Sequence, residues 1–125
     1  MKIPVRKNPR ANRDCVIELK THFALPPNPE TAGSGLAIRI RYVPDRLIAD
    51  LQKIKSYYNS LAAHSLDGIE EMANAIVDDF SNELIPRWVG VDVTMTRESD
   101  SASGSVHVED KQPLWENSAL LQRLN

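Results

Sequence analysis

The sequence predicts an α+β protein in which two helices pack on one face of a single antiparallel sheet. Segments with alternating apolar and polar residues lie on both sides of a central region, 45–84, where apolar residues recur at three- and four-residue steps. The length of 125 residues fits one domain, and 42% hydrophobic with 26% charged residues is an ordinary globular composition.

The N-terminal residues 1–12 are polar and show no periodicity, so we expect a flexible arm. A single domain is expected over 13–110, followed by a C-terminal tail over 111–125 that can form a short helix. The domain begins with a predicted strand, 13–20, whose apolar residues alternate with polar ones. Cys15 starts the apolar face of this strand and is interpreted as a small core residue.

A loop is expected over 21–35, because this segment holds three prolines and two glycines. The second predicted strand, 36–43, places its apolar side chains on one face. Arg39 and Arg41 point to the opposite face, toward solvent or a neighbouring subunit. The strand ends before Pro44, because a residue that precedes proline stays extended.

Two amphipathic helices are predicted next. The first begins at Pro44 and Asp45, with an apolar stripe of Leu47, Leu51, Ile54, Tyr58 and Leu61. The second covers 67–84, with a stripe of Ile69, Met72, Ala73, Ile76, Val77, Phe80 and Leu84. Asp67 is positioned to cap this second helix, with Glu70 as its capping-box partner.

The remaining elements are two strands and the tail. Strands are expected over 87–97 and 105–109, and apolar residues of the tail can dock as a short helix. These apolar residues are Leu114, Trp115, Leu120 and Leu121. The resulting sheet has two outer strands with exposed edges, which pairing with another subunit would cover. Closure of several subunits into a barrel would remove the edges altogether.

Composition argues against several partners. A net charge of −2 gives no basic field for nucleic acid or a membrane surface, and the basic N-terminal residues are interpreted as solvated. No apolar run is long enough to span a bilayer, and the N-terminus lacks the apolar core of a signal peptide. With a single cysteine, the expected compartment is the cytoplasm. The three histidines, His22, His64 and His107, are too scattered to predict a metal site.

A family resemblance enters through the helical region. The segment YVPD at 42–45 is followed by residues with a characteristic order. They are Lys55, Tyr57, Ser60, His64, Glu70, Asn74, Ile76, Asp79, Phe80, Pro86 and Arg87. This pattern resembles the 7-cyano-7-deazaguanine reductases (QueF), which belong to the tunnelling-fold (T-fold) superfamily. The resemblance spans about 13–110 and implies a ββααββ unit that oligomerises into a β-barrel with helices outside.

The resemblance also implies a ligand. A purine-, deazapurine- or pterin-like ring would be held at a subunit interface by a glutamate, and Glu70 occupies that position. A carboxylate suits this role because it accepts two charge-assisted hydrogen bonds in one plane. The alternative is that Glu70 serves only the capping box. His64 and His22 are further candidate ligand contacts, and together with Glu30 they are candidates for non-covalent chemistry; surface histidines are the alternative.

The catalytic residues of the reductases are missing. In that family a cysteine attacks the nitrile to form a thioimide, and an aspartate that follows it donates a proton. The corresponding positions here are Pro27 and Ser34, and no cysteine lies anywhere in 21–35. A proline cannot act as the nucleophile, and Ser34 has no evident activating base. The catalytic residues of this chain therefore stay unknown at this point.

The resemblance implies NADPH as cofactor, but its motif is incomplete. Lys55 and Tyr57 are present, whereas the first lysine of the motif is Gln52. We therefore expect a homologue that binds a heterocycle and is not a functional nitrile reductase. The alternatives are a non-catalytic oligomeric subunit or binding module, and an NADPH-dependent 7-cyano-7-deazaguanine reductase of queuosine biosynthesis.

Overall fold

The computed structural model describes residues 2–25, 33–65, 67–97 and 103–124. The strands are β1 (Val5–Lys7), β2 (Ile17–Ala24), β3 (Ser34–Val43), β4 (Leu47–Ala49), β5 (Trp88–Arg97) and β6 (Ser103–Lys111). The helices are α1 (Lys55–Ala63), α2 (Ile69–Glu83) and α3 (Ser118–Gln122). These elements confirm the predicted α+β class.

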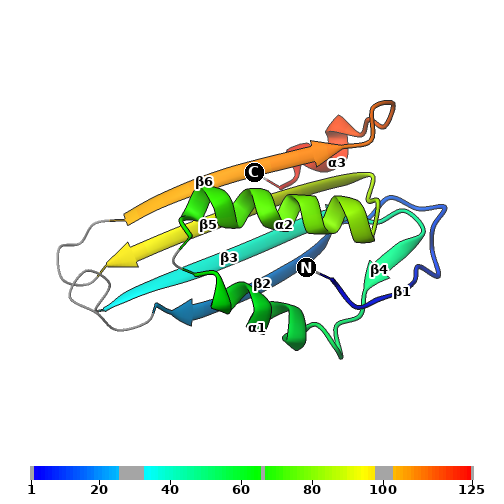
Figure 1. Ribbon diagram of the computed structural model, residues 1–125. Coiled ribbons are helices and arrows are strands. Elements are labelled where there is room, and N and C mark those ends of the chain that lie inside the picture. The colour runs from blue at the N-terminus through cyan, green and yellow to red at the C-terminus, as the bar shows by residue number, and fades with distance from the viewer. Residues whose placement is uncertain (1, 26–32, 66, 98–102, 125) are drawn as a thin grey trace.

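The main sheet contains four antiparallel strands in the order β2-β3-β5-β6, and β1 and β4 form a separate two-stranded sheet. Figure 1 shows α1 and α2 on one face of the main sheet. We call this face the inner face and the opposite one the outer face. The strands β2 and β6 are the two edges of the main sheet.

The core lies between the inner face and the two helices. Leu36, Ile38, Ile40 and Tyr42 of β3 point inward and are each at most 2% exposed, as their alternation predicts. The predicted stripe of the second helix is buried too, at Met72, Ala73, Ile76, Val77 and Phe80. The ring centroids of Tyr42 and Phe80 lie 5.4 Å apart, and this aromatic contact packs α2 against the centre of the sheet.

The predicted start of the first helix lies too early in the chain. We expected it to start at Pro44, but β4 occupies part of that segment and α1 begins only at Lys55. The backbone N–H of Ala49 in β4 donates a hydrogen bond of 3.0 Å to the Tyr42 hydroxyl. Leu51, which we placed in the apolar stripe, is 59% exposed. Over so short a segment, apolar spacing alone does not separate a helix from other conformations.

The N-terminal residues do not form the arm without regular structure that the sequence predicts. β1 pairs antiparallel with β4, and Ile3 is only 3% exposed. The side-chain amide of Asn8 donates a hydrogen bond of 2.8 Å to the carbonyl oxygen of Asp45. β4, the partner of β1, falls in a segment for which the sequence predicts a helix. The sequence therefore does not predict the pairing of β1 with β4.

Cys15 is exposed and precedes β2, so its interpretation as a core residue is wrong. The neighbouring Asp14 accepts hydrogen bonds from the side chains of Trp115, at 3.1 Å, and Asn117, at 3.0 Å. Asp14 also lies 3.2 Å from Arg87. These contacts hold the segment before β2 beside the C-terminal region and outside the sheet.

The C-terminal tail covers part of the outer face. Asn117 caps α3, because its side-chain oxygen accepts a hydrogen bond of 3.1 Å from the Leu120 N–H. Leu114 is 99% exposed, so its predicted docking is wrong. The carbonyl oxygen of Leu124 accepts a hydrogen bond of 3.1 Å from Arg41. Arg41 does point away from the core, but the tail covers it, leaving it 7% exposed.

Candidate functional site

Glu70 lies in the first turn of α2, and its side chain is exposed. The helix starts at the N-cap Gly68, whose φ of 107° suits glycine, and no side-chain hydrogen bond caps it. The capping box expected from Asp67 and Glu70 is therefore absent; Asp67 instead lies 3.2 Å from Nδ1 of His64. The Glu70 carboxylate is therefore exposed in the first turn of α2 and is not part of a cap.

The start of α2 lies near the end of the sheet where β3 and β6 begin and β5 ends (Figure 1). A Cβ atom added to Gly104 of β6 would lie 3.8 Å from Cδ1 of Ile69, which places the first residue of α2 against β6. Ser34 opens β3 opposite Arg97 of β5. Ser34 is 4% exposed, and its hydroxyl oxygen has no hydrogen-bond partner among the described residues. Glu70 and Ser34 therefore belong to the same end of the molecule.

A cavity of about 650 Å³ adjoins the end of β2 and the start of β3, and His22, Ser34 and Thr96 contribute to its lining. The exposed His22 side chain stands on the outer face of the sheet, whereas α2 begins on the inner face. The structure thus brings His22 near Ser34 but not to Glu70. His64, by contrast, lies in the short connection between α1 and α2, close to the start of the Glu70 helix.

The remaining candidate residues differ in accessibility. Lys55 is exposed at the start of α1. Tyr57 is 1% exposed and donates a hydrogen bond of 2.9 Å to the Asp79 carboxylate. Burial raises the pKa of Tyr57, and the nearby Asp79 carboxylate raises it further. This geometry argues against the cofactor contact implied for Tyr57. Pro27 and Glu30 lie outside the described residues.

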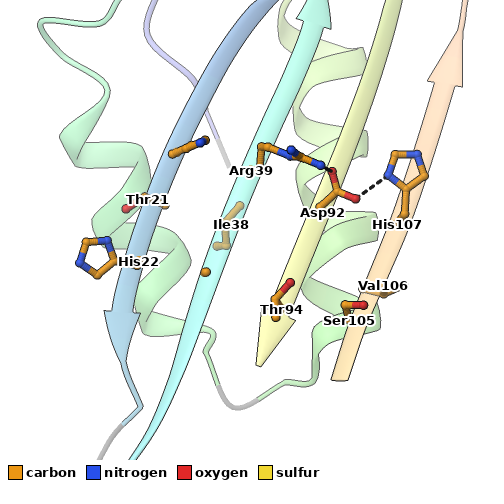
Figure 2. Close-up of a pocket in the computed structure, with 11 residues that line it drawn as sticks. Thr21, His22, Ile38, Arg39, Asp92, Thr94, Ser105, Val106 and His107 are labelled. Carbon is orange, nitrogen blue, oxygen red and sulfur yellow. Dashed lines mark hydrogen bonds and ion pairs between the residues drawn. The ribbon is translucent and has the colours of Figure 1, made fainter. Parts of the chain in front are cut away.

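A polar cluster on the outer face was not foreseen from the sequence (Figure 2). Asp92 of β5 is 3.2 Å from Nη2 of Arg39 on β3, and its other oxygen is 2.8 Å from Nδ1 of His107 on β6. Nε2 of His107 lies 2.9 Å from Glu109. The hydrogen bond to Glu109 and the contacts with Asp92 raise the pKa of His107, against the opposing effect of burial. The sequence gives little indication of this cluster, because its interacting residues come from three different strands.

Among the described residues, no group of three or more His, Cys, Asp or Glu side chains is arranged to hold a metal ion. No helix in the described part of the chain is long and apolar enough to cross a membrane. The expectations that the chain binds neither a metal nor a membrane stay predictions.

The fold and the candidate site define an α+β protein with a helix-backed antiparallel sheet and an exposed glutamate at a helix start. No family model matches the chain. The chain is 39% identical over 89 residues to the NADPH-dependent 7-cyano-7-deazaguanine reductase of Thermomicrobium roseum, a match that covers 67% of this chain and 66% of that relative. It is 29% identical over 107 residues to the enzyme of the same name from Prochlorococcus marinus, covering 80% of this chain and 68% of that relative. The two matches support the 7-cyano-7-deazaguanine reductase family as the family of this chain.

Proposed function

We propose that this chain is a T-fold relative of the 7-cyano-7-deazaguanine reductases that binds a purine, deazapurine or pterin through Glu70. The observation that carries the proposal is the exposed Glu70 carboxylate in the first turn of α2, free of the expected capping box. The similarity to two reductases supports the choice of a flat, hydrogen-bonding ring. A carboxylate accepts two N–H groups in one plane, and a desolvated site of this kind discriminates against rings that lack those donors.

The ligand site would lie at a boundary between subunits. The edge strands β2 and β6 end the main sheet, and β6 runs over nine residues, Ser103–Lys111. Strand edges with free backbone groups pair readily with another chain. Pairing of β6 with β2 of a second copy would extend the sheet and, on closure, give a barrel with α1 and α2 outside.

We propose further that the chain does not reduce nitriles by the covalent route of its relatives. The positions of the nucleophile and the proton donor correspond to Pro27 and Ser34. We do not expect Cys15 to replace the nucleophile, because it precedes β2 in the chain whereas position 27 follows this strand. The eight residues of β2 extend over about 26 Å at roughly 3.3 Å per residue.

One experiment tests the missing chemistry. The protein is incubated with 7-cyano-7-deazaguanine and NADPH while absorbance and intact mass are followed. We expect no thioimide adduct and no oxidation of NADPH. Either signal would show that a nucleophile is supplied elsewhere and would overturn this part of the proposal.

A second experiment tests ring binding. Thermal shifts are measured with guanine, 7-deazaguanines and pterins, because a ligand that binds the folded state raises the melting temperature. We expect Glu70→Gln to abolish the shift. Glu71→Gln is the matched control, since Glu71 is an exposed carboxylate in the same helical turn. The absence of any shift in the wild type would favour a non-catalytic oligomeric subunit instead.

A further inference from the structure

Arg41 on the outer face offers more hydrogen-bond donors than its surroundings accept. It is 7% exposed, and its Nε has no hydrogen-bond partner among the described residues. Nη1 donates to Leu124, and Nη2 lies 3.5 Å from Asp92. A guanidinium carries five N–H donors, and leaving a buried donor unpaired is destabilising. Arg41 therefore has an N–H donor left for a further acceptor.

Arg41 borders a cavity of about 430 Å³ between the outer face and α3. Arg39, on the same face of β3, and His107 of β6 also line this cavity. Same-face neighbours on a strand are about 7 Å apart, so two guanidinium groups at this spacing can reach one bound anion. Ser118 and Gln122 of α3 add polar groups on the opposite wall.

The charges around this cavity are unevenly shared. A single carboxylate, Asp92, lies 3.2 Å from Arg39, 3.5 Å from Arg41 and 2.8 Å from His107. Glu109 is paired with His107 at 2.9 Å, and Glu18 approaches Arg39 only at 4.0 Å. Glu109 also lines the cavity but pairs with His107, so Asp92 is the carboxylate that both guanidinium groups share, which leaves guanidinium N–H groups for another acceptor.

We propose that this cavity binds the phosphate group of a small molecule, held by Arg41 and Arg39 beneath α3. Phosphate offers several acceptor oxygens, and the planar guanidinium binds it through two parallel hydrogen bonds. A neighbouring cavity of about 480 Å³ shares Arg39, Asp92 and His107 and carries the hydroxyls of Thr94 and Ser105 (Figure 2). It gives room for the rest of a phosphorylated molecule. The site is separate from Glu70.

The test is calorimetric titration at constant ionic strength with inorganic phosphate and, in a second arm, with adenosine monophosphate. Arg39→Gln should weaken binding of either probe about tenfold, the loss expected for a charged hydrogen bond. Lys53→Gln is the matched control, because it removes the same charge at an exposed position that lines neither cavity. We expect it to change the affinity less than about twofold, as for a screened surface charge.

Arg41→Lys provides a second variant, which keeps the charge but loses the fork of donors. It should weaken both probes as well, with circular dichroism confirming that it is folded. Tighter binding of the nucleotide than of phosphate that persists in Glu70→Gln would support a phosphorylated molecule at this site, and equal binding would support the phosphate group alone as the determinant. Equal weakening by Arg39→Gln and Lys53→Gln would overturn the proposal, as would no saturable binding of either probe at millimolar concentration. Glu70→Gln should leave phosphate binding unchanged; a loss would overturn the location.

Discussion

The hydroxyl of Tyr57 on α1 donates a hydrogen bond of 2.9 Å to the carboxylate of Asp79 on α2. Tyr57 is 1% exposed and Asp79 is 9% exposed, so the bond lies in the interior. The Tyr57 ring also lies 6.2 Å from the ring of Phe80, edge to face. This contact joins the two helices to each other, while α2 makes an aromatic contact to the sheet through Phe80 and Tyr42.

Replacing Tyr57 with Phe should lower the free energy of unfolding by roughly 1–3 kcal/mol, because the buried Asp79 carboxylate loses a donor. Denaturant unfolding followed by circular dichroism measures the change. Tyr58→Phe is the matched control, one residue along the same helix and only half-buried. An equal loss in both variants would show that the Tyr57–Asp79 bond contributes nothing specific.

Arg87 should be among the residues most important for stability. Its guanidinium donates to the carbonyl oxygen of Pro44 at 3.1 Å and lies 3.2 Å from both Asp14 and Asp45. Its side chain is 17% exposed, so Arg87→Ala leaves two partly buried carboxylates without this partner and should cost about 3 kcal/mol. Thermal unfolding measures the loss. The exposed Arg46→Ala serves as control, and a comparable drop there would contradict the expectation.

Ile85 follows the C-cap residue of α2 with a φ of 48°, although it is β-branched and 62% exposed. Glycine adopts this conformation without the Cβ clash, and a left-handed residue at a helix end is most often glycine. Ile85→Gly should therefore raise the free energy of unfolding by about 1 kcal/mol. Ile85→Val keeps both the branching and the strain, so it should leave stability nearly unchanged. A destabilised glycine variant would mean that the Ile85 side chain makes a needed contact.

His107 should make stability depend on pH. Its pKa is raised above 6.5 in the folded protein by Glu109 and Asp92, whereas the unfolded chain keeps the ordinary value. Its contribution is therefore fully present below pH 6.5 and is lost as the pH rises through the raised folded pKa. Melting temperatures of the wild type and His107→Gln, compared from about pH 5 to about pH 9, should converge as the pH rises. A difference that grows with pH would contradict the assignment.

Several features could be predicted from residues close in sequence. The alternation of Leu36, Ile38 and Ile40 identified both the strand and its buried face. The stripe from Met72 to Phe80 identified the second helix and its packing side, because one face of a helix carries a regular spacing. The strand of Trp88–Arg97 was predicted within one residue of its bounds.

Other features depended on partners distant in the chain. Cys15 fits the alternation of β2, yet Asp14 is held by Trp115 and Asn117 about a hundred residues away, outside the sheet. Residues 5–7 form a strand only because β4 offers an edge to pair with. No local sequence pattern indicates such contacts, because they depend on which distant segments pack together in the folded protein.

The sequence by itself determined the α+β class, the buried faces of the central strands and of the second helix, and the placing of Glu70 at the start of that helix. These follow from periodicity, which depends only on local backbone geometry. The tertiary structure alone decided that Tyr57 is buried against Asp79, that His22 lies on the face away from Glu70, and that Arg39 and Arg41 meet Asp92 and His107. These are contacts between strands and helices far apart in the chain, and sheet register and helix docking fix them.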